Sequence, residues 1–192
     1  MIRKAAVNDI GEIWKIHQGS VLDVSRVSDK EYCAEVQANG FIVSGIKEAD
    51  EQERIEKSSI FDVFEEGGEV IGFVDVNNEI YFPEDADNTV WLTPGLKHSY
   101  FHGQDSTVLH HIGTVLSARR RGIARELFEN SLPTLKDRGY KHLFSIVTTG
   151  PVTNCPSIVW HTKMGFERAC TTTPVDIFGL KDYTSLLFHI SL

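Results

Sequence analysis

The stretch from Thr107 to Ala124, TVLHHIGTVLSARRRGIA, constrains the fold more than any other part of the chain. Residues Val108 to Val115 are rich in β-branched side chains and have the length of a buried strand. A turn containing Gly122 follows, and a helical pattern begins near Ile123. Such a turn leaves backbone N–H groups without helical partners at the positive end of the helix dipole. The sequence therefore predicts an anion site here, of the kind that binds phosphate.

The elements around this stretch predict an α/β fold. The pattern indicates a helix from Ile123 to Arg138, kinked or broken early at Pro133, and a strand from Lys141 to Thr149. A strand–helix–strand unit of this length is expected to be a right-handed parallel crossover. Upstream, Ser59 to Glu65 and Glu69 to Asn77 are expected to form a hairpin, because Gly67 and Gly68 supply the positive φ angles of a tight turn.

Two further segments have less regular patterns. Residues 46–57 are charged and are expected to form a helix with a solvated face. Residues 78–106 hold many aromatic side chains and are too long for a passive turn. We interpret them as an ordered insertion that covers the substrate side. The alternative is an extra pair of strands that only covers the core.

Composition limits the function classes. The 192 residues fit a single domain, residues 1–192, and the net charge of −8 argues against a nucleic-acid partner. The first residues lack an apolar signal stretch, and no run is long enough to suggest a membrane partner. The three cysteines have no metal-binding spacing, which favours reduced thiols and a cytoplasmic location.

Two motifs together resemble the GNAT N-acetyltransferase superfamily. Arg119-x-x-Gly122-x-Ala124 is similar to that family's pyrophosphate loop, (Gln/Arg)-x-x-Gly-x-(Gly/Ala). The downstream family pattern, Asn-x-x-(Ala/Ser)-Ile-x-aromatic-Tyr-x-Lys-x-Gly-Phe, is matched by Asn154 to Phe166, except that His161 stands where many members have Tyr. The family usually has Val-x-Pro just before the loop, whereas this chain has Thr114, Val115 and Leu116.

The resemblance implies a single GNAT-like domain. Its central sheet would be mixed and mostly antiparallel, flanked by helices, with a splayed parallel strand pair. The implied activity is transfer of an acetyl group from acetyl-CoA, used as co-substrate, to a primary amine. The amine would attack directly in a ternary complex, without an acyl-enzyme and without a metal. The expected partner is a small-molecule or peptide amine, and a homodimer is left open.

The resemblance also implies the residues that bind the cofactor. The backbone of the central strand would pair with the pantetheine arm, and the turn would bind the phosphates. Asn154 has a family role near the cofactor, although a helix cap explains it equally well. The expected cofactor-binding residues are Ile112, Gly113, Thr114, Arg119, Arg120, Arg121, Gly122, Ile123, Ala124 and Asn154.

Two histidines are the catalytic candidates. His110 resembles one histidine of the pair in aralkylamine N-acetyltransferases, and a base is useful because alkylamines are protonated at neutral pH. His161 could protonate the leaving thiolate as the general acid. His111 is expected on the opposite face of the strand from His110. A packed histidine remains the alternative at each position, and the histidine spacing does not match a zinc site.

Two other function classes compete with the enzyme. One is a non-catalytic acyl-CoA sensor or interaction module on the same fold. The other is a nucleotide-binding protein that uses the arginine turn for phosphate, although the sequence has no Walker-type loop. The identity of the amine acceptor does not follow from the sequence.

Overall fold

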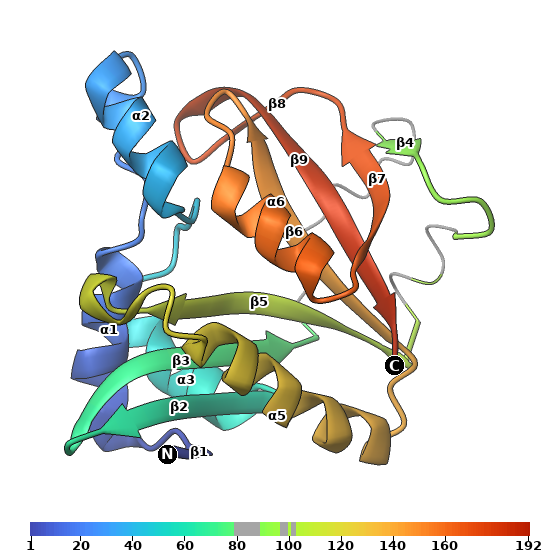
Figure 1. Cartoon of the computed structure of the whole chain (residues 1–192). Helices are drawn as coiled ribbons and strands as arrows, with labels where there is room; N and C mark the ends of the chain where they lie inside the picture. The colour runs from blue at the N-terminus through green and yellow to red at the C-terminus, as the bar shows by residue number, and fades with distance from the viewer. Residues whose placement is uncertain (79–88, 97–99, 101–102) are drawn as a thin grey trace.

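A twisted sheet runs through the molecule, with helices on both of its faces (Figure 1). The computed structural model describes residues 1–78, 89–96, 100 and 103–192. Within them the strand order is β1-β2-β3-β5-β6-β9-β7-β4, with β8 paired to β9. The strands are β1 (Ile2–Lys4), β2 (Ile60–Glu66), β3 (Glu69–Asn77), β4 (Thr89–Trp91), β5 (Ser106–Thr114), β6 (His142–Gly150), β7 (Glu167–Thr172), β8 (Val175–Ile177) and β9 (Leu180–Ser191).

The sheet is mixed and mostly antiparallel, as expected. Only β5 and β6 form a parallel pair among the described strands, and α5 connects them. The predicted hairpin is present as β2 and β3. The strand β8 was not predicted, since its three residues carry no alternating pattern.

Helices cover both faces of the sheet. They are α1 (Ile10–Gln18), α2 (Lys30–Asn39), α3 (Glu51–Lys57), α5 (Ile123–Asp137) and α6 (Cys155–Lys163). On one face α1 packs over Phe61 and Phe73, and on the other Leu127 and Phe128 of α5 pack over Val74 and Val76. No described helix has the length and apolar character needed to cross a membrane.

Two helix predictions need correction. Helix α5 continues through Pro133 to Asp137, so the predicted break is absent, while a kink stays a prediction. Pro133 is exposed, so the carbonyl that loses its N–H partner can face water. Helix α3 does not have only a solvated face, because Glu51 and Arg54 are buried. Charge in the sequence does not reveal burial when the buried charges pair with one another.

The segment 78–106 can be assessed only in part, since residues 79–88, 97–99 and 101–102 lie outside the described residues. Strand β4 pairs antiparallel with β7, and Trp91 packs against the core cluster around Phe144 and Leu187. These contacts extend the sheet and cover the core. A role of the segment on the substrate side stays a prediction.

Candidate functional site

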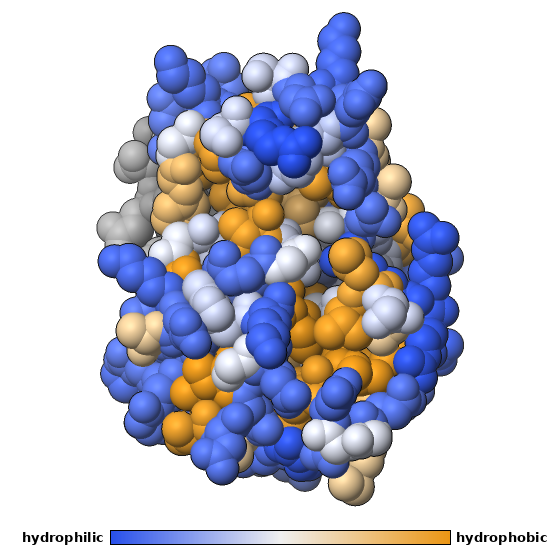
Figure 2. All heavy atoms as spheres, turned by 90° about the vertical axis from the view of Figure 1, so that its left-hand side faces the viewer, coloured by the Kyte–Doolittle hydropathy of each residue, from blue (hydrophilic) through white to orange (hydrophobic). Residues whose placement is uncertain are grey.

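The site begins where the parallel strands separate. β5 and β6 pair only at three positions, from Ser106 with His142 to Val108 with Phe144. Beyond Val108 the two strands diverge, and a cleft of about 1910 Å³ opens between them. Hydrophobic side chains line hollows on this side of the molecule, between hydrophilic rims (Figure 2). The divergence leaves backbone groups on one edge of β5 facing the cleft, where they need a partner.

A β-bulge distorts β5 inside the cleft. Asp75 of β3 pairs with His111, and the next residue, Val76, pairs with Leu109, so His110 is the extra residue. The bulge interrupts the alternation of side chains, and the rings of His110 and His111 meet edge to face with centroids 5.5 Å apart. The expectation that these two histidines face opposite sides is therefore wrong. A bulge of this kind re-aims side chains, and it lies beside the cleft.

The turn before α5 has the backbone shape of an anion site. Arg120 has a φ of 63° and Gly122 a φ of 88°, both in the left-handed region. A backbone in which left-handed residues alternate with other residues points successive N–H groups into one concavity. This concavity lies next to the first N–H groups of α5. Both residues line the cleft, as do Ile123 and Ala124.

The three arginines of the turn have different surroundings. Arg119 is half-buried and donates to Asn39 O and, at 3.4 Å, to Ser20 Oγ, so its guanidinium ties the turn to α2 and the end of α1. Arg120 is exposed and lines the cleft. Arg121 pairs with Glu66, Nη2 to Oε1 at 2.7 Å, and is not among the residues that line the cleft. The side chain of Arg120 is therefore the best placed of the three to reach a phosphate.

Asn154 joins two walls of the cleft. It is the N-cap of α6, where its Oδ1 accepts from Ser157 N at 3.2 Å, and its Nδ2 donates to Phe41 O. Its side chain is buried and also lines the cleft. The capping role explains this residue, and a direct contact with a cofactor stays a prediction.

His161 is buried against the sheet. Its Nδ1 lies 2.7 Å from Ser157 O, which can only accept, so Nδ1 carries the proton. Its Nε2 lies 2.9 Å from Ser145 Oγ on β6. Burial lowers the pKa of His161 to about 4, so the imidazole is uncharged at neutral pH. The sequence argument, which needed a partly protonated histidine, does not fit this environment, and the role as general acid remains only a prediction.

His110 lies between two cavities. A second cavity of about 490 Å³ adjoins the cleft and shares three of its residues, Ile46, Asp50 and His110. Asp50 and Glu53 bring carboxylates to its wall, and Arg54 and Lys57 bring positive charges. The remaining expected residues, Ile112, Gly113 and Thr114, line the main cleft along β5. Of the sequence-predicted site residues, all except Arg121 thus line the main cleft.

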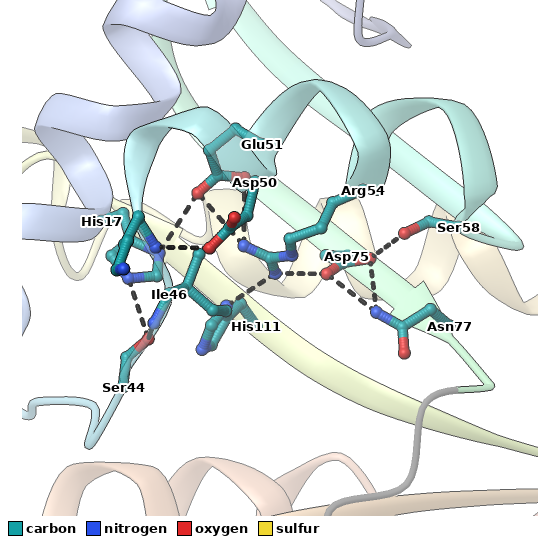
Figure 3. Close-up of polar contacts among 11 residues, drawn as sticks. His17, Ser44, Ile46, Asp50, Glu51, Arg54, Ser58, Asp75, Asn77 and His111 are labelled. Carbon is teal, nitrogen blue, oxygen red and sulfur yellow. Dashed lines mark hydrogen bonds and ion pairs between the residues drawn. The ribbon is translucent and has the colours of Figure 1, made fainter. Parts of the chain in front are cut away.

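A buried polar network lies under the bulge and was missed by sequence reasoning (Figure 3). Arg54 of α3 bridges Glu51, Asp75 and His111. The one sequence signal is Asp75, a carboxylate within the apolar run VIGFVDV. Such a residue in a buried strand requires a partner, but nothing local identifies Arg54 as that partner.

The ligand atoms of Asp75, His110 and His111 lie within 4.8 Å of one another. However, the guanidinium of Arg54 already contacts both Asp75 and His111. A fixed positive charge at this position opposes the binding of a metal cation. The donor set does not fit a metal centre, and the expectation of metal-free chemistry stays a prediction.

The open parallel pair, the bulge and the phosphate-type turn together define an N-acetyltransferase-like fold. The chain belongs to the Acetyltransferase (GNAT) family, whose model matches residues 30–166. No match is found among curated protein sequences.

Solved structures agree on the fold. An N-acetyltransferase from Staphylococcus aureus Mu50 is 20% identical, with a TM-score of 0.66 over 100% of this chain and 97% of that one. The ribosomal-protein-S18-alanine N-acetyltransferase from Escherichia coli is 14% identical, with a TM-score of 0.64 over 100% and 92%. The PaiA N-acetyltransferase from Thermoplasma acidophilum, solved with coenzyme A, is 12% identical, with a TM-score of 0.60 over 100% and 98%.

Proposed function

We propose that this protein is an acetyl-CoA-dependent N-acetyltransferase that acetylates a primary amine. The observation that carries the proposal is a cleft that runs from the turn before α5 along β5 to His110, where a second cavity shares three of its lining residues. A donor with phosphates at one end and a thioester at the other matches that order. The similar PaiA structure with coenzyme A supports the choice of donor.

The exposed edge of β5 would hold the pantetheine arm. Residues Ile112, Gly113 and Thr114 pair with β3 on one side, so alternate backbone groups face β3 and the others face the cleft. An extended amide-containing arm can satisfy the cleft-facing groups as an added strand would. The N–H groups at Gly122, Ile123 and Ala124 would receive the pyrophosphate, with Arg120 beside them.

The amine would enter through the second cavity. Its wall carries two carboxylates, Asp50 and Glu53, but also Arg54 and Lys57, and Lys57 pairs with Glu53, so the lining charge does not select for a charged acceptor. An ammonium group must lose a proton before it can attack, and His110, at the junction of the two cavities, is our candidate base. The nitrogen then forms a bond to the acetyl carbon and loses its second proton to solvent. The C–S bond breaks, and the sulfur leaves as thiolate, which takes a proton from solvent.

A sensor on the same fold is the competing function. It would bind acyl-CoA in the cleft but would have no use for an acceptor cavity, so the second cavity favours the enzyme. The three described cysteines are free thiols, which supports our further proposal of a cytoplasmic location.

Calorimetry followed by a turnover assay tests the proposal. Acetyl-CoA and CoA should bind with similar affinity, and ATP much more weakly, because only the first two carry the pantetheine arm. Thiol release should then depend on an amine from a panel of polyamines, amino acids, amino sugars and peptides. Equal binding of ATP would indicate a nucleotide-binding protein, and binding without turnover on any amine would indicate a sensor.

A further inference from the structure

The buried network under the bulge centres on Arg54 (Figure 3). Its Nη1 donates to both oxygens of Glu51, at 3.1 and 3.0 Å, and its Nη2 donates to Asp75. The same Nη2 lies 2.9 Å from Nδ1 of His111. Asp75 is held further by Ser58 Oγ at 2.6 Å and by Asn77 Nδ2. The guanidinium is therefore fixed from several sides.

These contacts determine where the proton of His111 lies. A guanidinium has only donors, so the contact between Nη2 and Nδ1 is a hydrogen bond only if Nδ1 accepts. An uncharged imidazole with an accepting Nδ1 carries its proton on Nε2. Figure 3 shows the second ring nitrogen of His111 on the side away from Arg54, and His111 lines the main cleft.

The surroundings keep His111 uncharged. Burial lowers its pKa well below the usual range, and the positive charge of Arg54 and the neighbouring His110 and His17 add to the effect. The ring of His17 on α1 contacts it edge to face at 4.9 Å. The two carboxylates nearby, Asp75 and Glu51, already accept hydrogen bonds from Arg54. His111 therefore has no free lone pair for an amine proton and can only donate.

We propose that His111 Nε2–H is a hydrogen-bond donor to the acetyl carbonyl oxygen, and that Arg54 is the positioning residue that fixes this tautomer. The inference rests on the proposed acetyltransferase function. When the amine attacks, negative charge develops on this oxygen before the C–S bond breaks. A donor that is oriented in advance, in a site with little water, stabilises that charge. His111 transfers no proton in this step.

The bulge allows the two neighbouring histidines to have different roles in the same site. Because His110 is the extra residue, both rings lie close together instead of on opposite faces. Arg54 contacts Nδ1 of His111. His110 is left as the candidate base, which takes the amine proton, while His111 serves as the fixed donor.

Nitrogen-15 NMR of histidine-labelled protein tests the tautomer without any need for turnover. His111 should show the Nε2–H pattern unchanged from pH 5.5 to 8.5, and its signals are assigned by their loss in His111→Gln. Arg54→Lys removes the guanidinium nitrogen that lies against Nδ1 and should let His111 change tautomer, whereas Arg125→Lys, at an exposed ion pair on α5, should not. An Nδ1–H tautomer, or protonation near pH 6.5 in the unaltered protein, would overturn the inference.

Kinetics test the role of the donor. His111→Leu should lower kcat by about 10²-fold or more and leave KM for acetyl-CoA near its original value. His111→Gln keeps an N–H donor and should recover part of this loss, and both variants should keep the pH profile of the base. His189→Gln, at a buried histidine that pairs with His142 away from the cleft, is the control and should keep kcat.

The failure of the two proposals can be distinguished. Normal turnover with a titrating His111, or equal rates of the Leu and Gln variants, defeats this inference alone. Turnover that is absent from the unaltered protein on every amine defeats the proposed function, and with it the catalytic role of His111. If Arg54→Lys does not fold, the tautomer and pH response of the unaltered protein still decide the matter.

Discussion

Single replacements of Arg120 and of Arg121 compare two adjacent side chains of equal charge, one that lines the cleft and one that does not. Arg120 is exposed and lines the cleft, whereas Arg121 pairs with Glu66 and is not part of the cleft lining. One charge-assisted hydrogen bond to a phosphate contributes about 1.5–3 kcal/mol, or about 10- to 150-fold in Kd. Arg120→Ala should therefore weaken acetyl-CoA binding by that factor.

Arg121→Ala should change the Kd by about threefold at most, because an exposed charge outside the cleft acts only through screened long-range attraction. Isothermal titration calorimetry at 0.15 M salt measures both variants. Repetition at 0.5 M salt should remove the small effect of Arg121, since the screening length shortens from about 8 Å to about 4 Å. Dephospho-CoA, which lacks the 3′-phosphate, shows whether Arg120 contacts that group or the pyrophosphate.

Equal losses for the two variants, or a larger loss for Arg121, would refute the assignment of the phosphate site to the cleft side of this turn. A loss for neither variant, in folded protein, would mean that the backbone N–H groups bind the phosphates without arginine. The sequence alone predicted that all three arginines bind the cofactor. This pair of variants therefore also tests the distinction between Arg120 and Arg121 that the structure makes.

Three further predictions concern backbone and burial. Gly122→Ala and Gly139→Ala add a methyl group at φ values of 88° and 85° with no atom within 4 Å, so both should lose similar stability, about 1–2 kcal/mol, but only Gly122→Ala should weaken acetyl-CoA binding. Comparable affinity losses would indicate a general effect of strain. Burial lowers the pKa of His161 to about 4, so the unfolded chain binds a proton below pH 6.5 that the folded protein does not. Lowering the pH from 7.5 to 5.5 should thus lower the free energy of unfolding by about 1.4 kcal/mol through this residue. In urea titrations His161→Phe should show a pH dependence that is smaller by that amount, and an unchanged dependence would contradict the burial argument. Phe178 has a φ of 51° and is exposed, so Phe178→Asn should keep or raise the melting temperature, because Asn tolerates left-handed backbone; a clear decrease would show that the ring is needed for folding.

The sequence was sufficient for the parts of the fold that local patterns encode. The hairpin of β2 and β3 follows from its glycine turn, and the β5–α5–β6 unit follows from a buried strand, a turn and an amphipathic helix. Because Gly122 is a strong local signal, the start of α5 was predicted at the correct residue, Ile123.

The features that could not be predicted depend on contacts between residues that are far apart in the sequence. The bulge at His110 is a matter of register between β3 and β5, which no single strand encodes, so the relation of His110 to His111 was predicted wrongly. The direction of Arg121 depends on Glu66, 55 residues away. The burial of Arg54 depends on Asp75 and His111, which only the folded sheet brings to it.

Initial velocities with ¹³C-acetyl-CoA and the best amine of the panel test the central claim most directly. If the cleft supports direct transfer, double-reciprocal lines should intersect, one thiol should form for each labelled amine, and protein incubated without amine should carry no label. Parallel lines with labelled protein would contradict direct attack. Binding of acetyl-CoA with no labelled amine from any acceptor would contradict the assignment as an acetyltransferase.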